Sequence, residues 1–343
     1  MRTTAALLIA LAACTKPAPR PCAVDASKVP PRPQWSATWK EQSLDEPPNG
    51  WIGSFAISPD GAQAVYANSL AGDFIPTSDG VSLMRIDLAD PVDRHPRIME
   101  LPGEALRNYA AIRWSANGVA WASWSAFGIA DPRETSVRVL EKIPKAGKDR
   151  PTFPLYSSAM SAPGGACVAV ILDTADKRML QAWNATPASA PAHQQPVEER
   201  ESLAAWETEG VLLLRAPPIV SSTSATIAAS SARWLDPASG RTAPERAPPA
   251  RAQASVWIGG GWLFIDAEGG VFWIARESAK DSAALPVAHL KPTLEPNEKL
   301  KQHHKWLRIF TADSGATVAV EEAVIGPRSD KRAMHLLLRA PGS

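Results

Sequence analysis

Apolar positions along the chain fall into pairs of short runs, and each pair is separated by a turn that contains glycine. In FAISPDGAQAVYAN, residues 55–68, one apolar run leads into Ser-Pro-Asp-Gly and a second apolar run follows. Gly and Asn tolerate the positive φ of tight hairpins, so each such unit predicts two antiparallel strands. The unit recurs six times, with its glycine at these positions: Gly61, Gly118, Gly165, Gly210, Gly261 and Gly315.

The spacing of these units predicts the fold. Successive glycines lie 57, 47, 45, 51 and 54 residues apart, and repeats of this length are typical of β-propeller blades. The second run of each copy is apolar on both faces, as expected for a strand between two neighbouring sheets. The pattern therefore predicts an all-β, six-bladed β-propeller with four-stranded antiparallel blades, and it favours six blades over seven.

Further apolar runs are predicted to supply the outer strands of each blade. Third strands are expected in VSLMRIDL (81–88), TSVRVLEK (135–142), KRMLQAW (177–183), TIAASSARWL (226–235), VFWIARE (271–277) and RAMHLLLRA (332–340). The clearest fourth strands are RIMELP (97–102) and PVAHL (286–290). The sixth copy runs out of chain after its third strand, and an unpaired edge strand promotes aggregation. We expect QWSATW, residues 34–39, to close the ring as the outer strand of the last blade.

The turn at residues 58–61, with its flanking strands, resembles the repeat of TolB-type propellers. Those proteins are six-bladed and occur in the periplasm or outside the cytoplasm. The likeness covers residues 35–343, but only residues 58–61 match the repeat motif fully, and Asn117 and Gly118 match it in part. The resemblance implies an extracytoplasmic propeller that meets its partners at a channel mouth or along its long loops.

The first fourteen residues, MRTTAALLIALAAC, combine Arg2 with nine apolar residues at 5–13 and then Cys14. A spanning helix needs roughly 20 apolar residues, so this shorter run predicts a secretory signal at residues 1–13. Leu-Ala-Ala-Cys at 11–14 resembles the lipobox of bacterial lipoproteins, in which the cysteine is lipid-modified and becomes the N-terminus. The resemblance implies lipid attachment at Cys14. An ordinary secretion signal with an incidental cysteine is the alternative.

The residues that follow Cys14 suggest a membrane and a spacer. Thr15 stands where an aspartate tends to retain lipoproteins at the inner membrane, so the resemblance favours the outer membrane. Residues 14–34 are rich in Pro and Ala, a composition typical of an extended, semi-rigid tether. The folded propeller domain is accordingly expected at residues 35–343.

Two cysteines remain if Cys14 carries lipid. The cell envelope permits disulfide bonds, and two cysteines allow one pairing. Because Cys22 lies in the predicted tether and Cys167 in a predicted buried strand, a bond would require the tether to fold back onto the domain. We therefore expect Cys167 to be a free, buried thiol.

Composition narrows the range of partners. The chain has 36 Lys and Arg against 35 Asp and Glu, a net charge of +1, so long-range attraction to nucleic acid is not expected. Its 32 prolines disfavour a helical protein. Most of its 13 tryptophans are expected to fill contacts between blades. Trp51 and Trp124, which lie next to predicted loops, are candidates for an aromatic platform under a sugar or peptide.

The sequence contains few candidate residues for catalysis or metal binding. Gly53-Ser54 is followed by Phe-Ala, so no nucleophile elbow is present there, and the six histidines lack the spacing of metal ligands. No catalytic residue, metal or cofactor is predicted. The favoured function is a lipid-anchored envelope propeller that binds a protein, peptide or glycan partner. One alternative is a lactonase- or lyase-like propeller enzyme with a metal in its central channel, and another is a purely structural repeat protein.

Overall fold

The computed structural model describes residues 22–35, 38–44, 51–69, 81–90, 96–102, 111–143, 155–186, 190–216, 231–278, 280–326 and 330–340. These ranges form six antiparallel sheets of four strands each. Their helical content is three short 3-10 helices: η1 (Ala26–Lys28), η2 (Asp281–Ala283) and η3 (Glu298–Leu300). No helix in this described part of the chain is long and apolar enough to cross a membrane.

Each sheet is one blade, and consecutive strands of a blade lie side by side. Blade 1 contains β2 (Trp51–Ile57), β3 (Gln63–Ser69), β4 (Val81–Asp87) and β5 (Arg97–Leu101). Blade 2 contains β6 (Ala111–Ser115), β7 (Gly118–Ala122), β8 (Ala126–Asp131) and β9 (Ser136–Lys142). Blade 3 contains β10 (Leu155–Ser161), β11 (Cys167–Asp173), β12 (Arg178–Asn184) and β13 (His193–Pro196).

The second half of the ring repeats this plan. Blade 4 contains β14 (Glu201–Glu207), β15 (Gly210–Arg215), β16 (Ser231–Leu235) and β17 (Thr242–Glu245). Blade 5 contains β18 (Ala254–Ile258), β19 (Gly261–Ile265), β20 (Gly270–Ala275) and β21 (Leu285–His289). Blade 6 contains β22 (His303–Thr311), β23 (Thr317–Ile325), β24 (Asp330–Arg339) and β1 (Trp39–Leu44).

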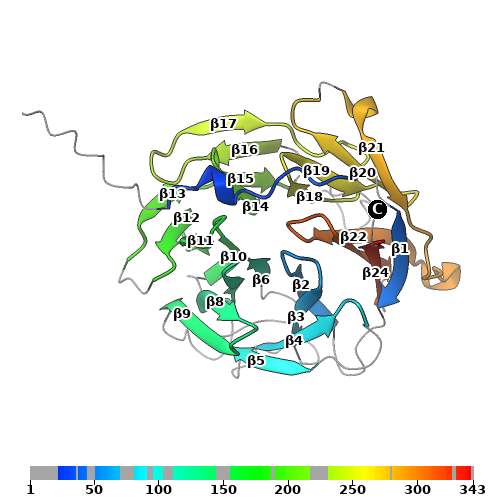
Figure 1. Ribbon diagram of the computed structural model, residues 1–343, viewed down its shortest axis with the longest axis horizontal. Coiled ribbons are helices and arrows are strands. Elements are labelled where there is room, and N and C mark those ends of the chain that lie inside the picture. Colours follow the sequence, from blue (N-terminus) through cyan, green and yellow to red (C-terminus); the bar gives the residue numbers. More distant parts are fainter. Residues whose placement is uncertain are drawn as a thin grey trace, which may run out of the picture.

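The blades are arranged as a closed ring around a central axis (Figure 1). The first strands of neighbouring blades contact one another around this axis, and β2 of blade 1 also contacts β22 of blade 6. The six-bladed β-propeller predicted from the glycine spacing is therefore confirmed.

One face of the ring carries the turn between the first and second strands of every blade, and we call it the turn face. These turns bond to one another across blade boundaries: Asn117 Nδ2 donates to the Gly164 carbonyl at 2.6 Å, and the Ser314 backbone N–H donates to the Pro59 carbonyl at 3.1 Å. At Gly61 the backbone has φ 80°, which only glycine adopts without strain. We call the opposite side of the ring the far face.

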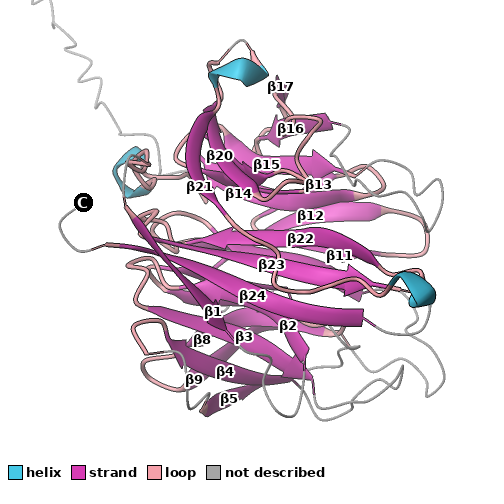
Figure 2. Ribbon diagram, turned by 90° about the vertical axis from the view of Figure 1, so that its right-hand side faces the viewer, coloured by secondary structure: helices cyan, strands magenta, loops and turns pink. Residues whose placement is uncertain are grey.

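An N-terminal strand closes the ring, as predicted. β1 pairs antiparallel with β24, from Trp39 opposite Arg339 to Leu44 opposite Met334, and it forms the outer strand of blade 6 (Figure 2). The strand lies further along the chain than the predicted segment 34–39 and shares only Trp39 with it. The reason is that Trp35, 5% exposed, packs instead into the core between blades 5 and 6.

One strand assignment from the sequence is wrong. Residues 135–142, predicted as the third strand of blade 2, form its fourth strand, β9, and the third strand is β8. Residues 123–125 between β7 and β8 contain neither Gly nor Pro, so the two strongest turn signals are missing there. Hydrogen bonds between Ser123 and the backbone of Ala126 hold this turn.

The hydrophobic core consists of six clusters, one between each pair of neighbouring blades. Second strands supply the centre of each cluster, since β7 and β19 are buried along their whole length. Ten tryptophans belong to this core, each at most 7% exposed: Trp35, Trp114, Trp121, Trp183, Trp206, Trp234, Trp257, Trp262, Trp273 and Trp306. The structural role predicted for most tryptophans is the observed one, and these ten leave too little indole surface for a ligand to stack on.

The N-terminal strap, residues 22–35, lies along the turn face. Cys22 is disulfide-bonded to Cys167 at the start of β11, so the expectation of a free Cys167 is wrong. The chain does fold back: Lys28 lies against Gly164, and Pro33 lies against Gly259 and Gly315. The strap therefore crosses the turn face from blade 3 to blades 5 and 6 (Figure 1).

Candidate functional site

The site residues predicted from the sequence lie apart in the structure. Trp51 begins β2 and Trp124 lies in the turn between β7 and β8, so both belong to the far face but to different blades. Trp124 is half-buried, and its carbonyl accepts a hydrogen bond from the Tyr156 backbone N–H at 2.9 Å. The side chain of Trp51 and all of Cys14 fall outside the described residues, and their proposed roles stay predictions.

The first strands of the six blades enclose a cavity of about 300 Å³ on the ring axis, which we call the central channel. Apolar side chains form most of its wall, with hydroxyl groups between them. The apolar side chains include Ile112, Met160, Leu203, Val256 and Phe310, and the hydroxyl groups belong to Ser54, Ser158 and Thr311. Three charged side chains also line it: Arg113, Asp313 and Arg308. A cavity with an apolar wall and a few polar groups is the usual form of a ligand site.

Arg113 and Asp313 lie at the end of the channel nearest the turn face. Arg113 is on β6 and donates through Nη1 to the Ala204 carbonyl of β14 at 2.9 Å. Asp313 lies in the turn that follows β22. Its carboxylate accepts no hydrogen bond and forms no ion pair within 4 Å among the residues described. The channel therefore contains a carboxylate whose oxygens are free to accept hydrogen bonds.

The electrostatics of this pair follow from burial. Burial raises the pKa of Asp313, and the positive charge of Arg113 offsets part of that rise. Burial lowers the pKa of Arg113, while the charges of Asp313 and Glu207 act in the opposite direction. Burial thus disfavours the charged form of each group, and the two side chains make no direct ion pair with each other.

The turn after β22 fixes the position of Asp313 by local hydrogen bonds. The Gly315 backbone N–H donates to the Ala312 carbonyl at 2.9 Å, and Thr317 Oγ1 donates to the Gly61 carbonyl of blade 1 at 2.8 Å. Gly315 has φ 66°, and a side chain there would collide with Pro33 of the strap. The turn is thus held by its own backbone, by blade 1 and by the strap.

The strap flanks this end of the channel. Lys28 and Pro30 line a space of about 80 Å³ together with Arg113, Trp114 and Asp313. The strap is held on both sides of this point, by the disulfide at Cys22 and by β1. A ligand that approaches the channel from the turn face therefore meets the strap.

The other end of the channel adjoins a second hollow. Arg308 and Phe310 line both the channel and this hollow of about 420 Å³, which runs along β18 and β22 toward the far face. Arg308 donates through Nε to the buried carboxylate of Glu321 and lies over the Phe310 ring, 5.4 Å from its centroid. We call this end the far mouth of the channel, and it gives a ligand a wider approach.

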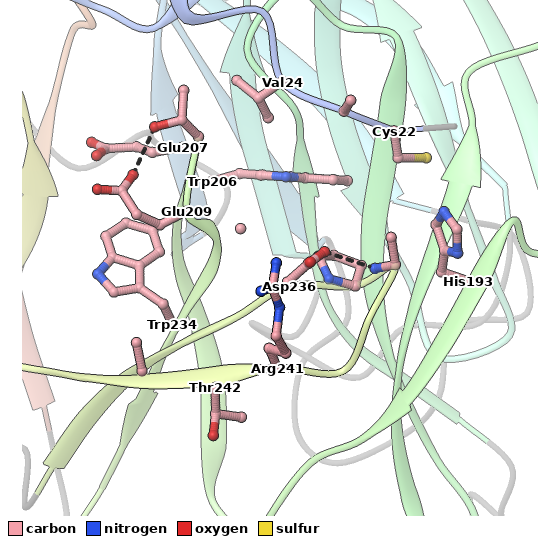
Figure 3. A pocket seen from close by; sticks show the side chains of 16 residues that line it. Cys22, Val24, His193, Trp206, Glu207, Glu209, Trp234, Asp236, Arg241 and Thr242 are labelled. Atoms are coloured by element: carbon pink, nitrogen blue, oxygen red, sulfur yellow. Dashed lines mark hydrogen bonds between the residues drawn. The ribbon is translucent and has the colours of Figure 1, made fainter. Parts of the chain in front are cut away.

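A third hollow, of about 530 Å³, lies between the strap and blade 4 on the turn face (Figure 3). Val24 lies on one side of the Trp206 ring in this view, and Asp236 and Arg241 lie on the other side. Its carboxylates already have donors. Glu207 accepts from Trp257 Nε1 at 2.7 Å, and Glu209 accepts from Thr208 and Arg276.

In the same hollow Asp236 accepts from Ser239 and from the Ala238 backbone N–H. All three carboxylates of this hollow are engaged, unlike Asp313, and the bonds of Glu207 and Glu209 to Trp257 and Arg276 hold blades 4 and 5 together.

The described residues offer few groups for metal binding or for acid–base catalysis in the channel. Among the described residues no cluster of three or more His, Cys, Asp or Glu side chains could hold a metal ion. Of the described residues that line the channel, Asp313 alone is a carboxylate. The lactonase- or lyase-like alternative needs several inward carboxylates, and nothing in these residues favours it.

Sequence reasoning missed Arg113 and Asp313. A usable signal for Arg113 was its place in AIRWS, an apolar segment that the repeat assigns to a first strand. A charged residue there either faces the channel or is buried between blades, and both cases are unusual. Asp313 gave no such signal, because Asp is common in turns.

No protein family model matches the chain, and no curated protein sequence matches it. Among solved structures, the fold is similar to Chaetomium thermophilum Raptor, with a TM-score of 0.46 and 10% identity over 89% of this chain and 30% of that chain. It is similar to the β-propeller domain of Myceliophteria thermophila Cps50 (Swd1), with a TM-score of 0.42 and 13% identity over 84% of each chain. It is also similar to a chain of the Mitotic Checkpoint Complex, with a TM-score of 0.43 and 11% identity over 99% of each chain. The chain spans about a third of the length of the Raptor chain, and all three likenesses concern the fold alone.

Proposed function

We propose that this protein is a lipid-anchored cell-envelope β-propeller that binds a protein or peptide partner at the far mouth of its central channel. One observation carries the proposal: the channel holds a carboxylate, Asp313, whose oxygens accept no hydrogen bond from the described residues. Asp313 is half-buried, and a carboxylate that loses part of its hydration without gaining a partner costs stability. Such a group persists where a ligand supplies the missing hydrogen bonds.

The disulfide supports a fixed orientation of the propeller on a membrane. Lipid at Cys14 would leave seven residues, 15–21, before Cys22, which is bonded to blade 3 on the turn face. Eight Cα–Cα steps span at most about 29 Å when fully extended. The turn face is therefore expected to stay near the bilayer, while the far mouth faces the aqueous compartment. The TKPAPRP sequence, with Thr15 after the cysteine, keeps the outer membrane as the proposed location.

The experiment uses the full chain expressed in a double-membraned bacterium. A photo-crosslinking amino acid is placed at Leu203, in the channel wall, and in separate cells at Asp60 on the turn face. We expect adducts of defined mass from Leu203 and none from Asp60, with the protein in the outer-membrane fraction. Cys14→Ala should release the protein from that fraction.

Three results would contradict parts of this proposal. Equal adducts from both positions would exclude the far mouth as the binding surface. Retention of Cys14→Ala in the membrane fraction would exclude the lipid anchor. Saccharide rather than peptide on the Leu203 adduct would replace the protein partner with a glycan.

A further inference from the structure

From the chemistry at the end of the channel nearest the turn face we infer that Arg113 and Asp313 together recognise a carboxamide group. This group is a backbone peptide unit, or an Asn or Gln side chain, of a segment that enters through the far mouth. This inference rests on the proposed function and names the chemical group of the partner that the channel selects.

The hydrogen-bonding capacity of the two side chains matches a carboxamide. A guanidinium has five N–H donors and no acceptor, and an ionised carboxylate has acceptors only. Among the described residues Arg113 donates one hydrogen bond, to the Ala204 carbonyl, so donors remain for a ligand oxygen. Asp313 can accept from a ligand N–H. A carboxamide presents one C=O and at least one N–H in a rigid plane, so it offers an acceptor to Arg113 and a donor to Asp313 in the same cavity.

The charges at this end of the channel disfavour an ionic ligand. Arg113 and Asp313 carry opposite charges, and so do Lys28 of the strap and Glu207, which also act on this end of the channel. The third charged side chain of the channel, Arg308, donates to Glu321. A free cation would be attracted by Asp313 and repelled by Arg113, and a free anion would meet the reverse. Either ion would also lose its hydration in a largely apolar cavity. A neutral carboxamide avoids that loss.

The channel wall between this pair and the far mouth fits the chain that leads to such a group. Ile112, Leu203 and Val256 offer apolar contacts, and Ser54 and Ser158 offer hydroxyl groups for further backbone hydrogen bonds. The adjoining hollow at the far mouth extends the path beyond Arg308. Ligand sites of about 300–1,000 Å³ are usual for small molecules, so the channel and this hollow can accommodate a short segment.

Three probes of matched shape test the inference: isovaleramide, isovalerate and isoamylamine, which share one branched apolar group and differ in their polar end. Each is titrated into the full chain, purified in detergent and labelled with ¹⁵N-tryptophan. The readout is the indole N–H signal of Trp114, which lines the channel beside Arg113 and Asp313 and is assigned by its loss in Trp114→Phe. We expect saturable binding of the amide, with the two ions bound about tenfold more weakly.

Variants make the test independent of overall folding. Asp313→Asn leaves Arg113 without its opposing charge and should reverse the preference toward isovalerate. Arg113→Gln leaves Asp313 alone and should shift it toward isoamylamine. Glu134→Gln, which removes an exposed carboxylate from an outer turn of blade 2, should leave the preference for the amide unchanged. A fold defect would weaken all three probes together and would not exchange their order.

The inference is wrong if the wild-type protein binds the three probes equally, binds none of them, or keeps its preference in Asp313→Asn. If Leu203 still cross-links a protein partner in those cases, the proposed function stands and the carboxamide assignment alone is lost. If the amide preference holds but no partner is captured, the channel site stands and the proposed function is lost.

Discussion

Two carboxylates of blade 6, only nine residues apart, lie in opposite surroundings. Glu322 on β23 is fully buried and accepts hydrogen bonds from five donors. These donors are the backbone N–H groups of Thr293 and Leu294, the Thr293 hydroxyl, and Nε2 of His304 and of His335. Asp313 accepts no hydrogen bond from the described residues and lines the channel instead.

The pKa values of the two groups move in opposite directions. Hydrogen bonds from His335, Leu294 and Thr293 outweigh burial and lower the pKa of Glu322 to about 2. Burial raises the pKa of Asp313, because no hydrogen bond compensates for it. Within one blade, the carboxylate with all its partners stabilises the fold, and the carboxylate without them is the one that a ligand can use.

The largest expected loss in the free energy of unfolding comes from Glu322→Ala. It leaves His335, whose Nδ1 also contacts Glu41 at 3.1 Å, and the loop at Thr293 without their shared partner. Removing one member of a buried charged network costs roughly 3–5 kcal/mol. Urea unfolding of this variant beside Asp313→Ala measures the contrast, since the Asp313 change should cost less than about 1 kcal/mol. Equal losses would remove the distinction between the two carboxylates.

The second effect concerns the strap, which lies beside Asp313 and not beside Glu322. The Cys22–Cys167 disulfide spans 145 residues of sequence, and such cross-links contribute about 2–4 kcal/mol. The double variant Cys22→Ser, Cys167→Ser should lose that amount in urea unfolding. Hydrogen exchange should rise at Ser314 and Gly315 and stay unchanged around Glu322. Faster exchange at both places would show that the strap supports the whole blade.

The sequence predicts some of these features and not others. The blades could be predicted because Gly61 and its equivalents mark a local turn, and because the following strands are apolar on both faces. The turn at 123–125 between β7 and β8 could not, since it carries no glycine or proline. The disulfide could not either, because no local pattern relates Cys22 to a cysteine 145 residues away.

The channel site needs the closed ring before it exists. Arg113 belongs to blade 2 and Asp313 to blade 6, and only the ring brings both to one cavity. Locally, Arg113 is one charge in an apolar strand and Asp313 is an ordinary turn residue. The absence of a described partner for Asp313 is a property of three-dimensional packing, which periodicity and composition do not encode.

The third effect is a pH dependence that comes from the Glu322 network. The pKa of Glu322 falls from 4.5 to about 2 on folding, so its contribution is present above pH 4.5 and is lost as the pH falls toward 2. Such a shift corresponds to about 3 kcal/mol. Hydrogen bonds from His335 to Glu322 and Glu41 outweigh burial and raise the pKa of His335 above 6.5. Its contribution is present below pH 6.5 and is lost as the pH rises through the folded value.

The free energy of unfolding, measured by urea at a series of pH values, should therefore show a network contribution that is greatest between about pH 4.5 and 6.5. Glu322→Ala should remove most of the acid-side slope. Persistence of the full slope in that variant would assign it to other carboxylates.

The smallest change in the free energy of unfolding is expected from Asp313→Asn, and the sign of that change is the most informative result. The folded protein raises the pKa of Asp313, so ionisation of this group opposes folding above the folded pKa, and the opposition is lost as the pH falls from there to the unfolded value. Asn removes the charge with little change of shape, and the variant should be as stable as the wild type or more stable, within about 1 kcal/mol.

The matched control is Asp131→Asn, because hydrogen bonds from Arg133 lower the pKa of Asp131 and its loss should be mildly destabilising. Urea unfolding at pH 7 and at pH 3 separates the two variants. A destabilised Asp313→Asn would mean that the channel carboxylate has a structural partner after all, and both Asp313 and Glu322 would then be parts of the scaffold.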